Sequence, residues 1–510
     1  TSHVKLMLNG EYMGAYVNTE HLDEEFVEEY YDKNEGNFYK CLWPATLEYI
    51  SQNPDDYKFE VNGRRAYDLK TNEEQDDYSD IAGFIEVLNN TSDAELPCAL
   101  ERKFNVADFL KVQALDVISG NWDGYAGNKN NFYLYHNPQT GLFDYIPYDL
   151  DNTWGIDWVD EEWETRDPYL WSPEFRPLYD RLMAIPEYRQ WYTYYLRKMI
   201  QEWAHPDSVS DYLNPRHAAL WPWVEWDSYY LMNFDFTMED FDESLDQAAG
   251  GHVEFGIMPW LETRLASLQG QLDAEVPVLV VHEVEDNAPV LDSLRIRTIV
   301  DGAGYNVDVT CWIDPGSGPI PFEMFDDGAH GDRGAGDGTW GIKVPIAWNW
   351  TNVSYHVQVT SSAGLERWIP CDPKTVTVGT SPSDLVINEL MSSNANNVSD
   401  EFGEFDDWVE LFNAGSASIS LGGKYLTDNL NDPSKYALPE GTLAAGDWAF
   451  YWLDNDPDQG PYHAPFTLSG GGEEIALLEW NEAAGVWVIL DFFQFGLSLI
   501  HISEPTRRYS

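Results

Sequence analysis

The period of the hydrophobic pattern changes near residue 280, and this change constrains the fold more than any other feature. Residues 1–275 combine apolar positions at helical spacing with short alternating runs, which predicts a mixed α+β domain. Residues 286–380 then alternate apolar and polar positions between Gly, Pro and Asp turns, as in "YNVDVTCWI" and "VSYHVQVTS". A second alternating region begins at Leu385. The sequence therefore predicts three domains, 1–275, 286–380 and 384–496, of which the last two are all-β sandwiches.

Four local patterns predict elements within residues 1–275. The segment "HVKLMLNGEYMGAYVNTE" is typical of a hairpin around Asn9-Gly10, and "LDEEFVEEYY" of an acidic helix start. An apolar stripe predicts a helix from Asn105 that ends at Gly120. "NNFYLY" and "LFDYIP" predict a second hairpin, and residues 176–275 are expected to be helical.

Charge and composition exclude several classes of protein. The 510 residues carry 29 Lys plus Arg against 88 Asp plus Glu, a formal net charge of -59. Such a chain is repelled by nucleic acid and by anionic lipid, so we expect neither as a partner, whereas cations and basic peptides are favoured. A solvated acidic surface without a partner explains the charge equally well. No apolar run reaches the length of a membrane span, and the 22 Trp and 30 Tyr exclude a disordered acidic chain.

The four cysteines do not show the spacing of a metal site. They predict either two disulfides, Cys41–Cys98 and Cys311–Cys371, in an extracytoplasmic protein, or four separate buried thiols. The motifs of zinc hydrolases, serine hydrolases and P-loop NTPases are absent from the sequence.

Residues 120–155, "GNWDGYAGNKNNFYLYHNPQTGLFDYIPYDLDNTWG", place acidic and amide side chains on both sides of a hairpin. Phosphoryl transfer needs a carboxylate that takes the proton of the acceptor hydroxyl and an amide oxygen that holds Mg²⁺, and Asp123 and Asn128 have the D-x-x-x-x-N spacing of such a pair. Asp149 and Asp151 follow the second strand, and in extended chain both face one cavity. The alternative is that Asp123 and Asn128 make turn hydrogen bonds and Asp151 caps a turn.

The chain resembles the CotH kinase family, the spore coat protein H type of atypical secreted protein kinase. The matching segments are "NGEYMGAYVNTEHLDEEF", "GNFYKC", "GNWDGYAGNKNNFYLY" and "IPYDLDNTWGID". The resemblance implies a reduced kinase-like fold, ATP, Mg²⁺ or Mn²⁺, and transfer to Ser or Thr of secreted or coat proteins. It implies that Asp123 is the catalytic carboxylate and that the metal ligands are Asn128, Asp149 and Asp151. Glu20 and Asn131 are assigned to nucleotide binding.

Both ends of the chain depart from this pattern. The family has a β-rich lobe before the "NGEY" strand, with a lysine that holds the ATP phosphates, and nothing precedes His3 that corresponds to it. Lys5 is a poor substitute, so we expect the N-terminally truncated domain to bind nucleotide weakly or not at all. The tail "LSLIHISEPTR" resembles the translation of a sequencing adapter, so 497–510 are interpreted as foreign and the true sequence as ending near Gly496.

Residues 384–496 resemble a lamin tail domain, an immunoglobulin-like sandwich, through "LVINELMSSN", "DWVELFNAG", "ISLGGKYLTDN" and "YALPEGTLAAGDWAFYW". The module is commonly appended to secreted bacterial enzymes and implies contact with a cell surface or polysaccharide, or a spacing role. Its final strands are missing here. Residues 286–380 are interpreted as a further immunoglobulin-like sandwich.

Two acidic loops of the β-domains are candidates for Ca²⁺, 325–341 with Asp326, Asp327, Asp332 and Asp337, and 454–460 with Asp454, Asp456 and Asp458. The alternative for the first loop is a solvated acidic turn. The Trp-rich runs 158–171 and 221–230 fit either core packing or stacking on sugars, and core packing is favoured.

Two functional hypotheses follow. The first is a secreted or cell-surface bacterial protein kinase that transfers the γ-phosphate of ATP to Ser or Thr of extracytoplasmic proteins. The second is a non-catalytic surface or adhesion scaffold with a pseudokinase-like module.

Overall fold

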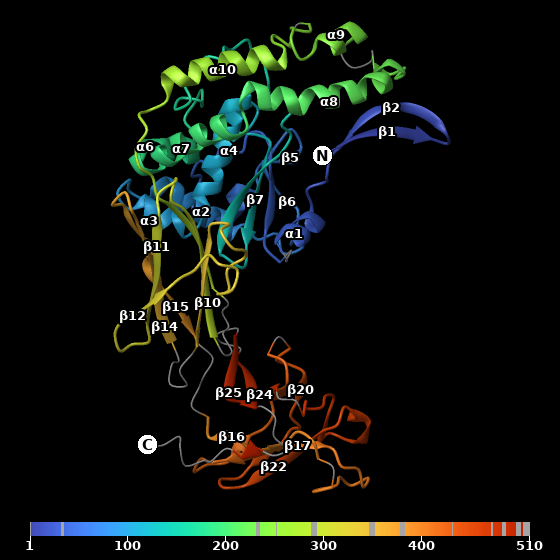
Figure 1. Cartoon of the computed structure of the whole chain (residues 1–510), viewed down its shortest axis with the longest axis vertical. Helices are drawn as coiled ribbons and strands as arrows, with labels where there is room; N and C mark the ends of the chain where they lie inside the picture. The colour runs from blue at the N-terminus through green and yellow to red at the C-terminus, as the bar shows by residue number, and fades with distance from the viewer. Residues whose placement is uncertain are drawn as a thin grey trace. The chain divides into compact units, whose positions relative to one another are not determined.

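The computed structural model describes residues 2–31, 35–230, 235–250, 252–286, 293–345, 352–377, 383–394, 396–430, 432–470, 473–481, 486–495 and 501–502. The chain divides into two compact units, each treated below by itself (Figure 1). The first comprises Thr1–Glu283, Ile299–Asp308 and Thr360–Pro370, and the second comprises the remainder.

The first unit mixes helices and strands, as the sequence predicts. Its helices are α1 (Glu24–Tyr31), α2 (Ser79–Asn90), α3 (Leu96–Glu101), α4 (Val106–Ser119), α5 (Tyr125–Asn128), α6 (Pro177–Ala184), α7 (Pro186–Glu202), α8 (Pro206–Glu225), α9 (Met238–Glu243) and α10 (Ile257–Gln271). Its strands are β1 (Ser2–Leu8), β2 (Glu11–Asn18), β3 (Phe38–Cys41), β4 (Glu60–Val61), β5 (Arg64–Arg65), β6 (Tyr67–Leu69), β7 (Phe132–Asn137) and β8 (Leu142–Pro147). The predicted acidic helix, the helix after Asn105, the second hairpin and the helical region 176–275 are confirmed.

The first hairpin, β1–β2, is also confirmed. Its strands pair antiparallel from Ser2↔Asn18 to Leu8↔Glu11, and both turn residues, Asn9 and Gly10, have positive φ angles of 53° and 86°. Both signs are those of a type I′ turn, which matches the twist of the paired strands. The Asn-Gly pair therefore fixes the register of this hairpin.

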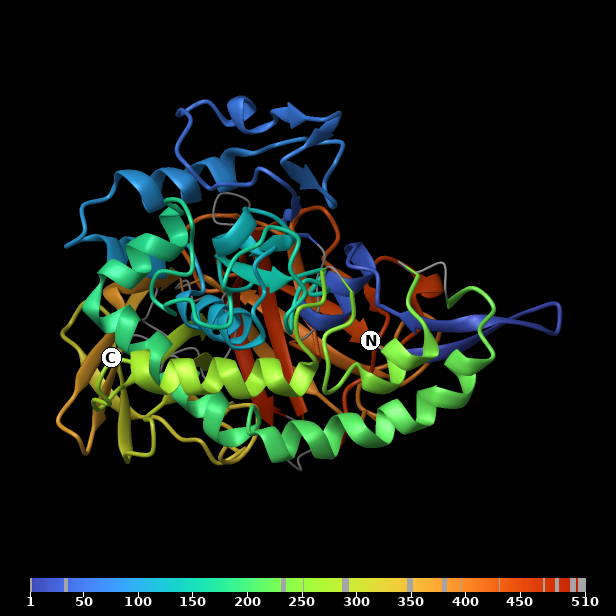
Figure 2. The same cartoon turned by 90° about the horizontal axis from the view of Figure 1, so that it is seen from above.

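A four-stranded antiparallel sheet, in the order β6-β3-β7-β8, positions the candidate site. Helix α4 packs against β8 and α7, and its buried face joins a core that includes Phe109, Leu110 and Val117. The long helices α8 and α10 contact one another, and they run side by side in Figure 2. The site described below follows directly from α4 and β8, so a packed core supports both of its arms.

The Trp-rich runs are used in different ways. Trp163 and Trp171 are 5% and 0% exposed and belong to the core, which confirms the core interpretation for these two residues of the first run, whereas Trp158 of the same run is 53% exposed. Trp226 in the second run is 65% exposed, so that residue is not core.

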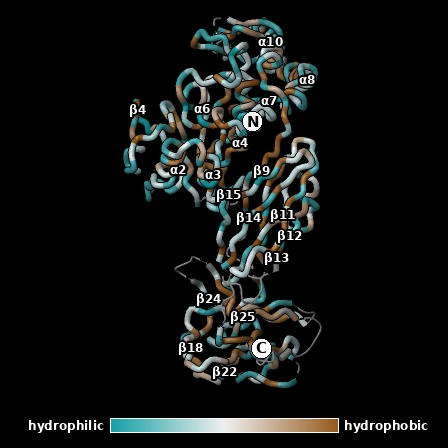
Figure 3. The backbone as a smooth tube through the Cα atoms, turned by 90° about the vertical axis from the view of Figure 1, so that its left-hand side faces the viewer, coloured by the Kyte–Doolittle hydropathy of each residue, from teal (hydrophilic) through white to brown (hydrophobic). Residues whose placement is uncertain are grey.

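The region from residue 280 onward is β-rich. Its strands are β9 (Val280–Asp286), β10 (Ser293–Asp301), β11 (Val307–Asp314), β12 (Ile320–Glu323), β13 (Thr339–Pro345), β14 (Asn352–Ser361), β15 (Glu366–Thr377), β16 (Leu385–Met391), β17 (Asp407–Asn413), β18 (Ile419–Ser420), β19 (Lys424–Thr427), β20 (Tyr436–Ala437), β21 (Thr442–Leu443), β22 (Trp448–Leu453), β23 (His463–Ala464), β24 (Glu473–Asn481), β25 (Val486–Phe495) and β26 (His501–Ile502). Figure 3 shows hydrophobic and hydrophilic residues interleaved along these strands, and in β14 the residues Val353, Tyr355, Val357 and Val359 are buried at every second position.

The strands before residue 380 form a three-stranded sheet, β13-β10-β9, and a four-stranded sheet, β12-β11-β14-β15. The strands after residue 384 form a five-stranded sheet, β23-β22-β17-β16-β26, and a four-stranded sheet, β20-β19-β24-β25. Leu411 of β17 and Leu477 of β24 belong to one core, so the last two sheets pack face to face as a sandwich. The predicted domain boundaries remain predictions. The predicted foreign tail lies outside the described residues except for His501 and Ile502.

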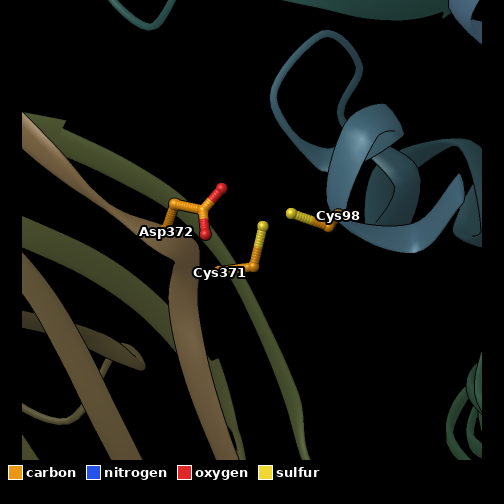
Figure 4. A group of neighbouring side chains, drawn as sticks. All are labelled: Cys98, Cys371 and Asp372. Atoms are coloured by element: carbon orange, nitrogen blue, oxygen red, sulfur yellow. The ribbon is translucent and has the colours of Figure 1, made fainter. Parts of the chain in front are cut away.

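The predicted cysteine pairing is wrong. Cys41 and Cys311 are free and buried, whereas Cys98 on α3 and Cys371 on β15 are disulfide-bonded, and Figure 4 draws these two with Asp372. The alternative of four free thiols is therefore wrong as well. Because Cys98 and Cys371 have no free thiol, neither is a thiolate ligand for a metal.

The acidic loop between β12 and β13 is a turn in which carboxylates accept backbone hydrogen bonds. Asp326 Oδ1 accepts from the N–H of Gly336 at 2.7 Å, and its Oδ2 accepts from the N–H of Gly338 at 3.0 Å. Asp332 accepts from the N–H groups of Gly328 and His330. These hydrogen bonds fit the acidic-turn alternative, and Ca²⁺ binding by this loop stays a prediction. Among the helices of the described ranges, none is long and apolar enough to cross a membrane.

Candidate functional site

Helix α4 delivers the first arm of the site. The Asn105 side chain caps its start by accepting from the N–H of Asp108, and Gly120, at φ 78°, ends it. Buried Asp116 on the last turn accepts from Asn121 Nδ2 at 2.8 Å and from Gln113 Nε2 at 3.0 Å. Burial raises the pKa of Asp116 to about 7, although these two hydrogen bonds lower it. Asp116 therefore holds the start of the loop that carries Asp123.

Two indole groups fix the same loop. Trp122 Nε1 donates to the carbonyl oxygen of Ile156 at 2.9 Å, and Trp171 Nε1 donates to that of Asn121 at 3.1 Å. A Cβ on Gly127 would lie 1.9 Å from the carbonyl oxygen of Trp122, so only glycine fits the one-turn helix α5. These hydrogen bonds and this close contact restrict the backbone conformation of the loop.

Asp123 lies at the centre of the candidate site. Asn128 Nδ2 donates to Asp123 Oδ1 at 2.5 Å, and Asn131 Nδ2 donates to Asp123 Oδ2 at 2.9 Å. Asn131 is 8% exposed and has a left-handed backbone, φ 54°, a conformation that asparagine tolerates better than most residues. Because Asn128 uses its amide nitrogen on Asp123, its amide oxygen is the atom left for a cation.

The second arm is the turn after β8. Asn152 Nδ2 donates both to Asp123 Oδ2, at 3.3 Å, and to Asp151 Oδ1, at 2.9 Å. These two hydrogen bonds share one nitrogen, so the two carboxylate oxygens lie no more than about 6 Å apart. Trp158 Nε1 donates to Asn152 Oδ1 at 3.0 Å and fixes the orientation of the bridging amide. The two arms that the sequence separates by a hairpin therefore meet.

Backbone hydrogen bonds join the arms as well. The N–H of Tyr148 donates to the carbonyl oxygen of Asn131 at 3.2 Å, and the N–H of Trp154 donates to that of Ser119 at 2.7 Å. The turn between them is not extended, because Asp149 has a φ of 57°. The expectation that Asp149 and Asp151 share a face by strand alternation is therefore wrong, although both are exposed at this turn.

Negative charge accumulates at the cluster. Burial and then the charges of Asp149 and Asp123 raise the pKa of Asp151. Within the described ranges, no Lys, Arg or His forms an ion pair with any of these three carboxylates. Three carboxylates and a neighbouring amide oxygen offer the hard oxygen ligands that Mg²⁺ or Mn²⁺ prefers, so the residues fit a divalent cation.

Glu20 is placed differently from the other predicted site residues. Its carboxylate accepts a hydrogen bond from Tyr30 Oη of α1 at 3.3 Å, and the described contacts do not join it to Asp123. Asn152 and Asp116 are two residues of the site that the sequence motifs do not predict. Asn152 directly follows "DLD" and was detectable as a polar neighbour, whereas nothing in the helical pattern marks Asp116.

These features define a mixed helix–strand domain with an acidic, oxygen-lined site, followed by a β-rich region. Residues 1–250 match the family model described as CotH kinase protein, and residues 379–491 match the model described as Lamin Tail Domain. The first part of the chain is thus a CotH-family domain, and the last part is a lamin tail domain with an immunoglobulin-like sandwich. The resemblance stated from the sequence is confirmed.

Three curated relatives match the chain. Inner spore coat protein H of Bacillus subtilis is 27% identical over 226 residues, which cover 44% of this chain and 59% of that protein. Spore coat protein homolog 1 of Rhizopus delemar is 23% identical, with 34% of this chain and 30% of that protein covered. Invasin CotH7 of Rhizopus delemar is 25% identical, with 25% and 22% covered. The chain thus spans 59% or less of the length of these relatives.

Among solved structures, a DUF4876 family protein from Bacteroides thetaiotaomicron aligns with 38% of this chain and 72% of its own. Its TM-score is 0.13 and its sequence identity 12%, so this likeness carries no argument about the fold.

Proposed function

We propose that the CotH-family domain is an atypical protein kinase that transfers the γ-phosphate of ATP to Ser or Thr of extracytoplasmic proteins. The observation that carries the proposal is the meeting of Asp123 and Asp151 around the Asn152 amide. Phosphoryl transfer depends on positioning and on neutralisation of charge, and this cluster supplies a carboxylate for the acceptor hydroxyl beside ligands for a cation.

Each side chain has a role in this proposal. Asp123 orients the acceptor hydroxyl and takes its proton, while Asn128 and Asn131 hold the carboxylate in place. Asp151, with Asp149 and the amide oxygen of Asn128, holds Mg²⁺ or Mn²⁺. A bound cation neutralises charge on the phosphate groups of ATP.

A neighbouring cavity supports a nucleotide site. It has a volume of about 710 Å³, and its lining includes Lys40 and Lys70 together with four carboxylates, those of Asp23, Glu24, Glu73 and Glu74. Lys70 pairs with Asp68, so Lys40 is the lysine of this lining that the proposal assigns to phosphate. Lys40 Nζ lies 4.4 Å from the ring centroid of Tyr148, the residue before Asp149. Lys5 Nζ lies instead 4.0 Å from the ring centroid of Trp223 on α8. Lys40 is therefore a better candidate than Lys5 for a contact with the nucleotide phosphates, because its aromatic partner is next to Asp149.

The relatives' names support a location at a surface. Two are named as spore coat proteins and one as an invasin, which agrees with a secreted or cell-surface protein. In this proposal the protein is bacterial and its β-domains contact the cell surface or polysaccharide. The lamin tail domain, with its separate core, is suited to a spacing or binding role.

The second candidate function is a non-catalytic surface or adhesion scaffold. It is favoured by one observation: both oxygens of Asp123 already accept hydrogen bonds from Asn side chains. A purely structural carboxylate would be bonded in the same way.

Incubation with γ-labelled ATP, Mg²⁺ or Mn²⁺ and acceptor proteins separates the two functions. We expect label transfer to fall by about 100-fold or more in Asp123→Asn and Asp151→Asn, because general acid–base catalysis and metal binding each contribute at this scale. Asp458→Asn, a change in the other compact unit, is the control. Transfer that both site variants retain at the control level would refute the kinase.

A further inference from the structure

A second cluster of carboxylates lies in the lamin tail domain, on the segment between β16 and β17. One carboxylate oxygen each from Asp400, Glu404 and Asp406 lies within 4.8 Å of the other two. Asp400 is only 8% exposed, so more than nine-tenths of it is buried. Three like charges at this spacing repel one another unless something compensates for them.

The turn 400–404 fixes one half of the Asp400 carboxylate and leaves the other half without a partner. Asp400 Oδ1 accepts from the N–H of Phe402 at 2.9 Å and from that of Glu404 at 2.7 Å. Asp400 Oδ2 is buried and has no hydrogen-bond partner, and the same is true of Asp406 Oδ2. Burial of a carboxylate oxygen without a donor is costly, so two such atoms in one cluster indicate a missing ligand.

The adjacent Asp407 shows that the local backbone is able to satisfy a carboxylate. Its Oδ1 accepts from the N–H of Asn394 at 3.4 Å, and its Oδ2 accepts from that of Leu468 at 3.1 Å. Asp406, one position earlier, has no such donor for Oδ2. Asp406 and Asp407 therefore have different surroundings. The carboxylate of Asp406 lies with those of Asp400 and Glu404.

Additional negative charge surrounds the cluster. Asp454, which follows β22, is close enough for its charge to act on Asp406. Within the described part of the chain, no Lys or Arg pairs with Asp400, Glu404 or Asp406. Gln459 Nε2 donates to Glu404 Oε2 at 2.7 Å. His463 Nδ1 contacts Asp454, its Nε2 lies 3.5 Å from Glu401 without a hydrogen bond, and its charge also acts on Asp406. One imidazolium offsets at most one of these negative charges. The missing ligand is therefore positively charged.

We propose that Asp400, Glu404 and Asp406 form a Ca²⁺ site in the lamin tail domain. The donor set consists of oxygen atoms alone, which suits Ca²⁺ and excludes metals that select nitrogen or sulfur. Ca²⁺–oxygen distances of about 2.3–2.6 Å allow two ligands of one ion to lie at most about 5 Å apart. The three oxygens all lie within 4.8 Å of one another, so they are close enough to share one ion. Water and carbonyl oxygens complete the coordination of six to eight that Ca²⁺ takes.

This site differs from both calcium loops that the sequence predicts. In 325–341 the carboxylates of Asp326 and Asp332 already accept backbone hydrogen bonds. In 454–460 the structure joins Asp454 to His463 instead of grouping it with Asp456 and Asp458. Bound Ca²⁺ joins the turn 400–404 to the start of β17, so its effect is to stabilise this edge of the sandwich.

The test measures Ca²⁺ binding by the full chain, with calorimetry and with thermal unfolding in Ca²⁺ and in chelator. We expect one site that Asp400→Asn and Asp406→Asn weaken at least tenfold. In Asp400→Asn the new side chain retains an oxygen that accepts from the N–H groups of Phe402 and Glu404, so this variant preserves the turn. Asp456→Asn serves as the matched control for the predicted loop 454–460, and Asp151→Asn as the control for the CotH-family site. Both should keep the binding of the parent chain.

The sign of the stability change provides a second readout. In chelator, Asp406→Asn should unfold at the same temperature as the parent chain or at a higher one, because it removes repulsion. In saturating Ca²⁺ it should lose the upward shift that the parent chain shows. The absence of binding, equal binding by all variants, or loss of binding only in Asp456→Asn would each overturn the proposal. A variant that is less stable in chelator would also overturn it, because the carboxylates would then be structural.

Discussion

Asp116 is the buried carboxylate behind the loop that carries Asp123, and its protonation links the stability of that loop to pH. Its pKa in the folded protein is about 7, above the ordinary value of 3.8, so the folded state favours the protonated form. The stabilisation is fully present below about pH 4 and is lost as the pH rises through 7.

We therefore expect Asp116→Asn to remove this part of the pH dependence of the free energy of unfolding. At pH 8 the variant should be more stable by about 1–3 kcal/mol, because a neutral amide replaces a buried charge. Gln113 Oε1 and Asn121 Oδ1 lack partners at this position and are available to accept from the new amide. Urea unfolding from pH 4 to 8 measures the effect. A variant that keeps the slope of the parent chain between pH 4 and 7 would contradict it.

Lys40 provides a second test at the scale of single residues. Lys40→Met should weaken nucleotide binding by roughly tenfold, about 1.4 kcal/mol, because the cavity loses a cation beside Tyr148. Lys5→Met, which removes a lysine on the β1–β2 hairpin, is the matched control and should bind as the parent chain does. Fluorescent nucleotide titration measures both. Equal affinities in the two variants would remove Lys40 from the proposed site.

At the scale of elements, the end of α4 depends on one glycine. Gly120 has a φ of 78°, and a Cβ there would lie 2.2 Å from Cζ2 of Trp260 on α10. Gly120→Ala should therefore lower the free energy of unfolding by about 2 kcal/mol or more, from backbone strain and overpacking together. Gly63→Ala is the control, because Gly63 has a similar φ of 77° and open space around it. It should cost only about 1 kcal/mol. Equal losses would show that packing against Trp260 is unimportant.

Local patterns were sufficient to predict the elements that flank the site. The apolar stripe and Gly120 predict α4, and Asn9-Gly10 predicts the first hairpin, because neighbouring residues decide these structures. The left-handed turn at Asp149 was not predictable from alternation, since it depends on how the chain leaves β8. The bridging role of Asn152 depends on contacts 29 residues away along the chain, and no local pattern reports these.

The cysteines illustrate the same limit. Pairing by order along the chain connected near neighbours, whereas Cys41 and Cys311 lie in the interior of their sheets as free thiols. The Ca²⁺ cluster shows the converse: its three residues are close in sequence, but only the structure reveals that two of their oxygens lack donors.

At the scale of the whole molecule, the two compact units have separate hydrophobic cores. Leu110 in the first and Leu411 in the second are both 0% exposed. We expect Leu110→Ala to lower the unfolding temperature of one calorimetric transition and Leu411→Ala that of another, each with a loss of about 2–5 kcal/mol. A single transition that both changes shift equally would contradict the expectation.

The Asn152 bridge affects the rate at which the CotH-family site exchanges ions under the proposed function. One neutral amide already occupies the position between two acids where a cation would act. Entry of a metal then requires rotation of that side chain. The backbone hydrogen bonds of Tyr148 and Trp154 hold the two arms together meanwhile. Loading should therefore require loss of the hydrogen bonds of Asn152, including the one from Trp158, and loss of water from the ion, but no slower rearrangement of the chain.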